Sequence, residues 1–217
     1  MSYFKPFSKV YYEFPDNIIR AYTDISIRPA VVDALKNGEV DLELYEITDG
    51  QTPETIAFDV YGRANLHWTI MLANDIMNLY TDWPISEDEL ILVLSDKYRV
   101  QYDSEGTDVT LDDTQVLEFL QFVGTPQNDY MSNIEVGSKT IVIHPHHFED
   151  ADGNYYSWGS HVNSKDAFGR EVIMPELFPV SYYEYETKLN DAKRLINLPS
   201  IQTVQRMEKE LRKLVNE

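Results

Sequence analysis

The chain has no cysteine among its 217 residues, which excludes disulfides and thiolate ligands or nucleophiles. It has only nine glycines, and none belongs to a glycine-rich loop of the kind that cradles phosphate in nucleotide-binding proteins. No apolar run has the length of a membrane span, and the N-terminus has no apolar core typical of a secretory signal. We therefore expect no cofactor, no membrane association and no small-molecule substrate.

Basic residues are also scarce, with 18 against 37 acidic ones, so the net charge is −19. Residues 181–217 hold seven of the basic and six of the acidic groups, which leaves a charge of −20 on the rest. Such an acidic body repels phosphate, so we expect no binding to nucleic acid. Tyrosine, in contrast, is abundant at 15 residues, and its apolar ring with a polar tip suits surfaces that become half-buried against a partner.

The first of four predicted segments, residues 1–39, begins with aromatic side chains that are too apolar to stay solvated. This arm either packs on its own domain or inserts into a neighbouring protein. Further on, Pro29 to Lys36 has the apolar spacing of a short helix. The candidate partner-binding residues of the arm are Phe4, Phe7, Tyr11 and Tyr12.

The second segment, residues 40–100, predicts a strand followed by two helices. Apolar and acidic residues alternate from Val40 to Ile47, which is typical of a half-buried strand. Thr52 can cap the next helix, with Pro53 at its first position and Gly62 at its end. A second helix is expected from about residue 65 to residue 74, and a third from Ser86, which opens a capping box with Glu89, to Tyr98.

The third segment, residues 101–180, has turn residues between short apolar runs and predicts β-rich structure. We expect a strand at 140–143 and a hairpin around the turn at 150–154, whereas 117–123 fits either a strand or a short helix.

The last segment, residues 181–217, predicts one helix from Tyr182 to Ile196 and another from Ile201 to Val215. The second helix has an apolar seam that needs a partner helix, inside the chain or outside it. The candidate contact residues of the seam are Val204 and Leu211. Together, the four segments predict an α+β fold: a strand, helix, helix core with flanking helices, a β-rich middle insertion and C-terminal helices.

Three histidines, His144, His146 and His147, precede several carboxylates and form the one cluster that suggests metal chemistry. On a strand His144 and His146 share a face while His147 points away, and Pro145 would disturb the strand pairing. No H-E-x-x-H helix supplies convergent zinc ligands. We interpret the cluster as residues of a polar hairpin and predict neither a metal site nor an enzyme.

The residues from Tyr45 to Ala57, with Tyr45-x-Ile47, then Asp49-Gly50-Gln51-Thr52-Pro53-Glu54 and Ile56-Ala57, resemble the start of a LysM domain. The continuation through Tyr61-Gly62, Trp68, Asn74-Asp75 and Asp82-Trp83-Pro84 is similar to the LysM-like core of the small baseplate wedge subunit of contractile-tailed phages of the T-even type. The similarity covers about residues 40–98 and, more weakly, the C-terminal segment. Residues 101–177 match nothing recognisable and are interpreted as a lineage-specific insertion.

The resemblance implies a structural, non-catalytic protein of the virion tail baseplate, assembled in the cytoplasm of the bacterial host. Such a subunit clamps the wedge core and joins neighbouring wedges during assembly. Its expected partners are other wedge subunits, neighbouring copies of the wedge, and sheath- or tube-proximal baseplate proteins. We expect Trp68 to lie in the core, and Tyr80 and Trp83 to pack against protein.

An alternative follows from the LysM resemblance, since LysM domains bind polymers of N-acetylglucosamine such as peptidoglycan. The residues at the corresponding groove are Asp49, Gly50, Gln51, Thr52, Asn74 and Asp75. The chain departs from the sugar-binding pattern after Asn74, where the usual Pro-Gly-Gln is missing. The two hypotheses therefore differ in whether this stretch holds sugar or protein.

Overall fold

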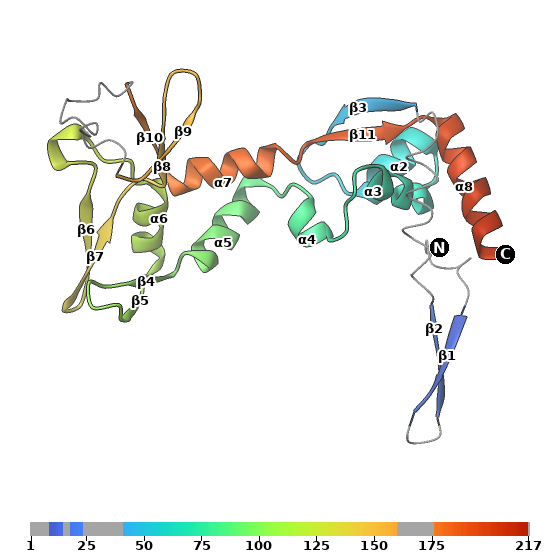
Figure 1. Ribbon diagram of the computed structural model, residues 1–217, viewed down its shortest axis with the longest axis horizontal. Coiled ribbons are helices and arrows are strands. Elements are labelled where there is room, and N and C mark those ends of the chain that lie inside the picture. Colours follow the sequence, from blue (N-terminus) through green and yellow to red (C-terminus); the bar gives the residue numbers. More distant parts are fainter. Residues whose placement is uncertain (1–8, 15–17, 24–40, 160–175, 217) are drawn as a thin grey trace, which may run out of the picture. The chain divides into compact units, whose positions relative to one another are not determined.

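The computed structural model describes residues 9–14, 18–23, 41–159 and 176–216. These residues belong to two compact units (Figure 1). The first comprises the residues up to Pro84 together with those from Ala192 onwards, and the second spans Ile85 to Asp191. The predicted helix at 29–36 and the aromatic residues Phe4 and Phe7 lie outside the described residues.

The first unit combines two small antiparallel sheets with helices. One sheet is the hairpin of β1 and β2, and the other pairs β3 with β11. The elements are β1 (Lys9–Glu13), β2 (Ile19–Thr23), β3 (Leu42–Glu46), α2 (Pro53–Tyr61), the short 3-10 helix η1 (Ala64–Leu66), α3 (His67–Ala73), α4 (Leu79–Asp82), β11 (Leu195–Pro199) and α8 (Ile201–Asn216).

Helix α2 begins and ends where the sequence predicts. The Thr52 hydroxyl accepts a hydrogen bond from the Thr55 N–H, and the Thr55 hydroxyl accepts one from the Thr52 N–H. The two bonds form a capping box. Pro53 occupies the first turn, and Gly62 ends the helix in the left-handed conformation at φ 70°. These local signals therefore confirm the predicted α2.

The helix expected from Tyr182 to Ile196 is shorter than predicted, because α7 (Tyr182–Asp191) ends five residues earlier. Residues 195–199 form β11 instead, which pairs antiparallel with β3 so that Ile196 lies opposite Tyr45. The pairing satisfies backbone groups of two segments about 150 residues apart in the sequence, a tertiary effect that local helix propensity cannot reveal.

The core of the first unit lies between α2, α3 and the inner face of the β3–β11 sheet. The Tyr61 hydroxyl donates to the Pro199 carbonyl at 2.7 Å, and burial raises the pKa of Tyr61 to about 12. Trp68 is buried, as expected. The buried cluster consists of Ile47, Ile56, Ala57, Leu66, Ile70, Ile76, Trp83, Ile196, Leu198 and Val204.

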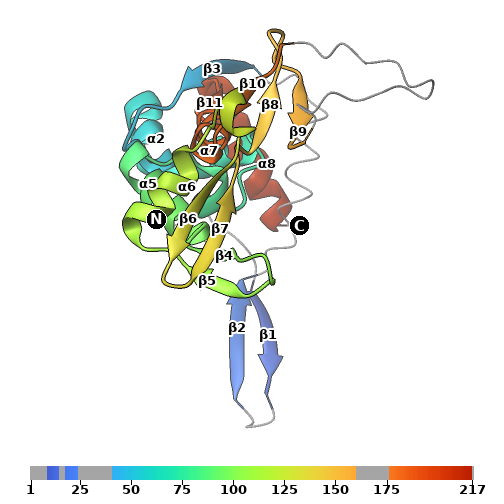
Figure 2. The same cartoon turned by 90° about the vertical axis from the view of Figure 1, so that its left-hand side faces the viewer.

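The second unit carries the β-rich part of the chain, and its described sheets are all antiparallel (Figure 2). β4 pairs with β5, β6 with β7, and β8 lies between β9 and β10. The elements are α5 (Glu87–Lys97), β4 (Val100–Tyr102), β5 (Asp108–Thr110), α6 (Asp113–Gln121), the 3-10 helix η2 (Pro126–Asn128), β6 (Ser132–Val136), β7 (Lys139–Ile143), β8 (His147–Glu149), β9 (Tyr155–Ser157), β10 (Phe178–Val180) and α7.

Several local predictions for this unit are confirmed. Ser86 caps α5 in a capping box with Glu89, the strand at 140–143 is part of β7, and the turn at 150–154 joins β8 to β9 in a hairpin. The ambiguous run at 117–123 is mostly helical, within α6. The expectation of a mixed α+β fold is confirmed.

Asn190, near the end of α7, ties the two ends of the second unit together. Its side-chain carbonyl accepts from the Ile85 N–H at 3.0 Å, and its amide donates to the Ile85 carbonyl at 2.9 Å. The side chain is buried, which favours these bonds over exchange with water. The chain therefore enters and leaves the second unit at neighbouring points.

No helix among the described residues is long and apolar enough to cross a membrane.

Candidate assembly surface

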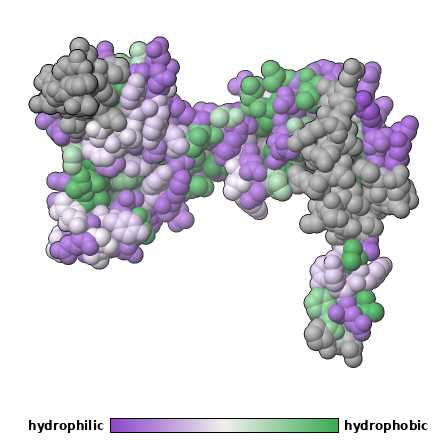
Figure 3. All heavy atoms as spheres, viewed as in Figure 1, coloured by the Kyte–Doolittle hydropathy of each residue, from purple (hydrophilic) through white to green (hydrophobic). Residues whose placement is uncertain are grey.

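The outer face of the β3–β11 sheet is apolar and exposed (Figure 3). Because side chains alternate across a strand, Leu42, Leu44 and Glu46 share this face with Leu195, which lies opposite Glu46. Leu44 is 72% exposed and Leu195 is 61% exposed. The alternation at residues 40–47 predicts a half-buried strand with its leucines covered. In the structure Leu42 and Leu44 are exposed to solvent, and Tyr45 and Ile47 pack on the core instead.

A second apolar feature lies at α4, where Met77 is 74% and Tyr80 is 94% exposed. The Asp82 carboxylate accepts hydrogen bonds from the backbone N–H groups of Asn78 and Met77, and the Asn78 bond is the largest cause of a lowered pKa at Asp82. These bonds fix the turn that presents both side chains. Methionine and tyrosine are enriched at protein interfaces, so this turn has the composition of a contact site.

The candidate sugar groove is occupied by hydrogen bonds and ion pairs within the chain. Asp49 pairs with Arg194 at 2.8 Å. The Gln51 side-chain carbonyl accepts from the Thr48 N–H at 3.0 Å, and its amide donates to the Tyr45 hydroxyl at 2.9 Å. Gly50 turns the chain at φ 78°. Thr52 serves as the cap of α2.

Asn74 has a structural role at the end of α3. Its amide donates to the carbonyls of Ile70 and Asn197, each at 2.8 Å, and its side-chain oxygen accepts from the Asn197 N–H at 2.8 Å. Asn74 thus holds the edge of β11 that faces away from β3. Asp75 follows at φ 53°, which turns the chain away from α3.

Three of the predicted partner-binding residues are buried within the first unit. Trp83 is 7% exposed and its indole N–H donates to the Gln51 carbonyl at 2.8 Å. Val204 and Leu211 are buried as well, so the apolar seam of α8 is covered within the chain. These three side chains offer no surface to a partner in this structure. Among the predicted residues that the structure describes, Tyr11, Tyr12 and Tyr80 do.

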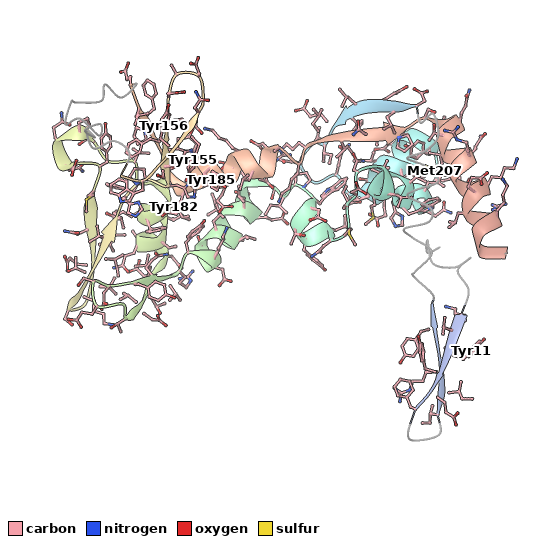
Figure 4. All side chains as sticks on the ribbon, in the orientation of Figure 1. Tyr11, Tyr155, Tyr156, Tyr182, Tyr185 and Met207 are labelled. Atoms are coloured by element: carbon pink, nitrogen blue, oxygen red, sulfur yellow. The ribbon has the colours of Figure 1, made fainter. Side chains whose placement is uncertain are left out.

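The three histidines are in the second unit and stack on rings of β9, of α7 and of the turn after β9. Figure 4 labels two of these rings, Tyr155 and Tyr185. His144 stacks on Trp158 at 4.3 Å between ring centroids, His146 on Tyr185 at 4.0 Å and His147 on Tyr155 at 4.6 Å. Stacking at these distances uses the ring faces for packing.

Several ring nitrogens of this cluster also make polar contacts. Nδ1 of His146 and Nδ1 of His147 lie 2.9 Å apart, so one donates while the other accepts. Nε2 of His147 lies 3.1 Å from Glu149, which Lys188 also contacts at 2.9 Å. The Lys188 contact is the largest cause of a lowered pKa at Glu149. Within the described part of the chain, no group of three or more histidines or carboxylates is placed to hold a metal ion.

The sequence matches the family model described as "Base plate wedge protein 53" over residues 37–214. The chain belongs to this family. It is a structural component of the phage tail baseplate, it is not an enzyme, and its partners are baseplate proteins. The resemblance to baseplate wedge subunits is thereby confirmed. No curated protein sequence was found to match the chain.

For this wedge protein, the match extends from residue 37 to residue 214, so its bounds enclose residues 101–177. The interpretation of those residues as an insertion stays a prediction. Sequence reasoning also missed the exposed face formed by Leu42, Leu44 and Leu195, because β11 was not predicted. Met77 was missed too, although its place beside Tyr80 in a turn after α3 was a usable signal.

Proposed function

We propose that this wedge protein clamps the core of the baseplate wedge and joins neighbouring wedges during baseplate assembly. The observation that carries the proposal is the set of apolar side chains that the first unit leaves exposed on a chain of net charge −19. In a baseplate protein, such side chains are buried when the assembly forms. The side chains concerned are Leu42, Leu44, Leu195, Met77 and Tyr80.

A LysM-like core in the first unit is part of the proposal. The order strand, helix, helix, strand is given by β3, α2, α3 and β11, with the strands antiparallel. In this reading the closing strand of the LysM-like unit is β11, and the second unit is inserted before it. The two hydrogen bonds between Asn74 and Asn197 support this arrangement, because they join the second helix directly to the closing strand.

The division into two units supports a clamp. Each unit has its own buried cluster, and the described residues of one cluster contain none from the other unit. Two separately folded bodies on one chain can contact two different partners at once, which gives avidity without requiring either contact to be tight.

The proposal is tested by co-expressing the chain with the other wedge subunits and purifying wedges through a tagged partner. We expect the wild-type chain to co-purify and the double variant Met77→Ser, Tyr80→Ser to co-purify at least about tenfold less, since an interface anchor contributes roughly 1.4 kcal/mol or more. The matched control is Val100→Ser with Tyr102→Ser, which removes two exposed apolar residues of β4.

A wild-type chain that stays free of wedges would refute the proposal. Equal loss in both double variants would assign the effect to general surface polarity instead of the α4 turn.

The peptidoglycan alternative finds no support in the site, because the groove residues are engaged within the chain. Trp83, the aromatic residue best placed by sequence to stack on a sugar, is buried. We expect no retention of the wild-type chain on insoluble peptidoglycan in a sedimentation assay. Retention that a Trp83→Ala change abolishes would restore this alternative.

A further inference from the structure

The hairpin of β1 and β2 is the described part of the N-terminal segment, and "the arm" refers to this hairpin from here on. It has one strongly apolar face. The cross-strand pairs Val10–Tyr22 and Tyr12–Arg20 place these four side chains on the same side of the ribbon. The Tyr12 and Tyr22 rings meet edge to face at 5.9 Å, and the Arg20 guanidinium lies 4.8 Å from the Phe14 ring. The face is thus an aromatic and aliphatic surface that carries a single cation.

The arm does not bury this face within its own hairpin. Tyr12 is 56% and Tyr22 is 45% exposed. A hairpin of two strands is at best marginally stable in water on its own, since it lacks a second layer to cover its apolar side. The arm therefore needs a surface on which to lie.

The outer face of the β3–β11 sheet has matching properties. It is also a two-stranded antiparallel ribbon with five residues in each strand, as in the arm. Its exposed leucines, Leu42, Leu44 and Leu195, share the face with one charged residue. This residue, Glu46, lies opposite Leu195 at the end of β3 and makes no ion pair within the described part of the chain. Helices already cover its inner face, so only the outer face lacks a second layer.

We infer that the arm of one copy packs its apolar face on the outer β3–β11 face of a second copy. Two twisted ribbons of equal length pack face to face as in a β-sandwich. The charges are complementary, because the arm brings Arg20 and the sheet presents Glu46. Burial of leucines against tyrosines supplies the apolar contact area that stabilises such an interface.

A second copy is the occupant that fits the exposed faces, since both remain uncovered in the single chain. The contact is heterologous: each copy offers an arm and a sheet, and these differ. Such contacts repeat from copy to copy and form a ring when the rotation closes. The inference deepens the proposed joining of neighbouring wedges and rests on it.

The absence of cysteine makes a cross-linking test direct. One preparation of the full chain carries Val10→Cys and the other, isotopically heavy, carries Leu44→Cys. After mixing and mild oxidation, mass spectrometry counts the disulfide dimers that contain one light and one heavy chain. We expect about tenfold or more of these over the control, because docking raises the effective concentration of one thiol near the other. The control pairs Leu44→Cys with Tyr102→Cys on β4 of the second unit, where Tyr102 is 66% exposed against 36% for Val10, so greater exposure alone would favour the control.

Two outcomes overturn the inference. A mixed-dimer yield equal to that of the control shows that the arm does not dock on the sheet of another copy. A double variant, Val10→Cys with Leu44→Cys in one chain, that closes mainly into an intrachain disulfide shows that the arm lies on its own sheet. If cross-linking fails while the chain still enters wedges, only this inference is lost. If the chain does not enter wedges, the proposed function is lost.

A charge exchange gives an independent readout. Arg20→Glu added to the Val10→Cys chain should lower the mixed-dimer yield, because two carboxylates then face each other. Adding Glu46→Arg to the Leu44→Cys chain should restore the yield, since the pair is again of opposite sign. Restoration by the second change is not expected if either substitution acts only by perturbing its own hairpin or sheet, and a yield that stays low would contradict the inferred pairing.

Discussion

Polar side chains at the positions of the candidate sugar groove form hydrogen bonds that stabilise the fold. Asn74 shows this most clearly, since its amide group contacts backbone atoms of both Ile70 and Asn197. Asn74 is half-buried. Removal of such an amide leaves its backbone partners without hydrogen bonds, and this loss costs more free energy than the net gain from forming the bonds. The groove predicted from the LysM resemblance is therefore, at Asn74, a strand anchor.

We predict that Asn74→Ala lowers the free energy of unfolding by about 2 kcal/mol, because the N–H and carbonyl of Asn197 lose their partners. Hydrogen exchange gives the most direct measurement, since the Asn197 amide should exchange faster than its neighbours in β11. Asn133→Ala is the matched control, as Asn133 is an exposed residue of β6. Unchanged exchange at Asn197 in the Asn74 variant would show that the strand does not depend on this side chain.

His146 is expected to make the stability of the second unit depend on pH. Burial is the largest cause that lowers the pKa of His146 from its ordinary 6.5, aided by His147, Lys97 and His144, while Glu186 opposes the shift. The folded state thus prefers neutral His146, whereas the unfolded chain takes up a proton at higher pH. The stability that His146 contributes is therefore fully present about one pH unit above 6.5 and is lost as the pH falls through and below that value.

We predict that the free energy of unfolding of the second unit decreases between about pH 7.5 and pH 5.5, a window above the range in which ordinary carboxylates titrate. His146→Phe keeps a ring to stack on Tyr185 but cannot be protonated, so its stability should change less over the same range. Urea titrations at several pH values provide the measurement. Parallel pH profiles for the wild type and the variant would contradict a role for His146.

At the level of elements, helix ends were the most predictable feature, because a cap involves residues only three or four positions apart. Thr52 and Ser86 open α2 and α5 as predicted. Strand β11 was not predictable, since its partner β3 is about 150 residues away and its local pattern continues that of α7. The exposure of Leu42 and Leu44 on β3 was missed as well. Alternation shows that the two faces of a strand differ, but it does not show which face is covered.

Gly62 allows a prediction about an element boundary. Its φ of 70° suits glycine, and no atom lies within 4 Å of the place a Cβ would occupy, so the effect of a substitution is conformational and not steric crowding. Gly62→Val should lower stability by about 1 kcal/mol or more, whereas Gly62→Asn should have a smaller effect because asparagine tolerates the left-handed region. Thermal unfolding of the two variants would decide, and equal melting temperatures would show that backbone conformation at Gly62 is not limiting.

For the whole molecule, the sequence indicates the family and the mixed α+β class but not the arrangement of the units. The described core of the first unit draws on residues from both ends of the chain, such as Ile47 and Ile196, and contains none from Ile85 to Asp191. Only a structure shows this, because the pairing of β3 with β11 joins segments about 150 residues apart. The double hydrogen bond between Asn190 and Ile85 further shows that the second unit begins and ends at one place.

We therefore predict that the first unit folds without the second. Replacing Ile85 to Asp191 by a Gly-Ser linker of about four residues shortens the loop between α4 and β11, and shorter loops lose less entropy on closure. The variant should unfold cooperatively, with the Trp83 indole N–H protected from hydrogen exchange by its bond to the Gln51 carbonyl. If this bond and cooperative unfolding are lost, the first unit depends on the second for its fold. If they are kept, the amount of the variant that co-purifies with wedges measures how much of the binding the first unit provides alone.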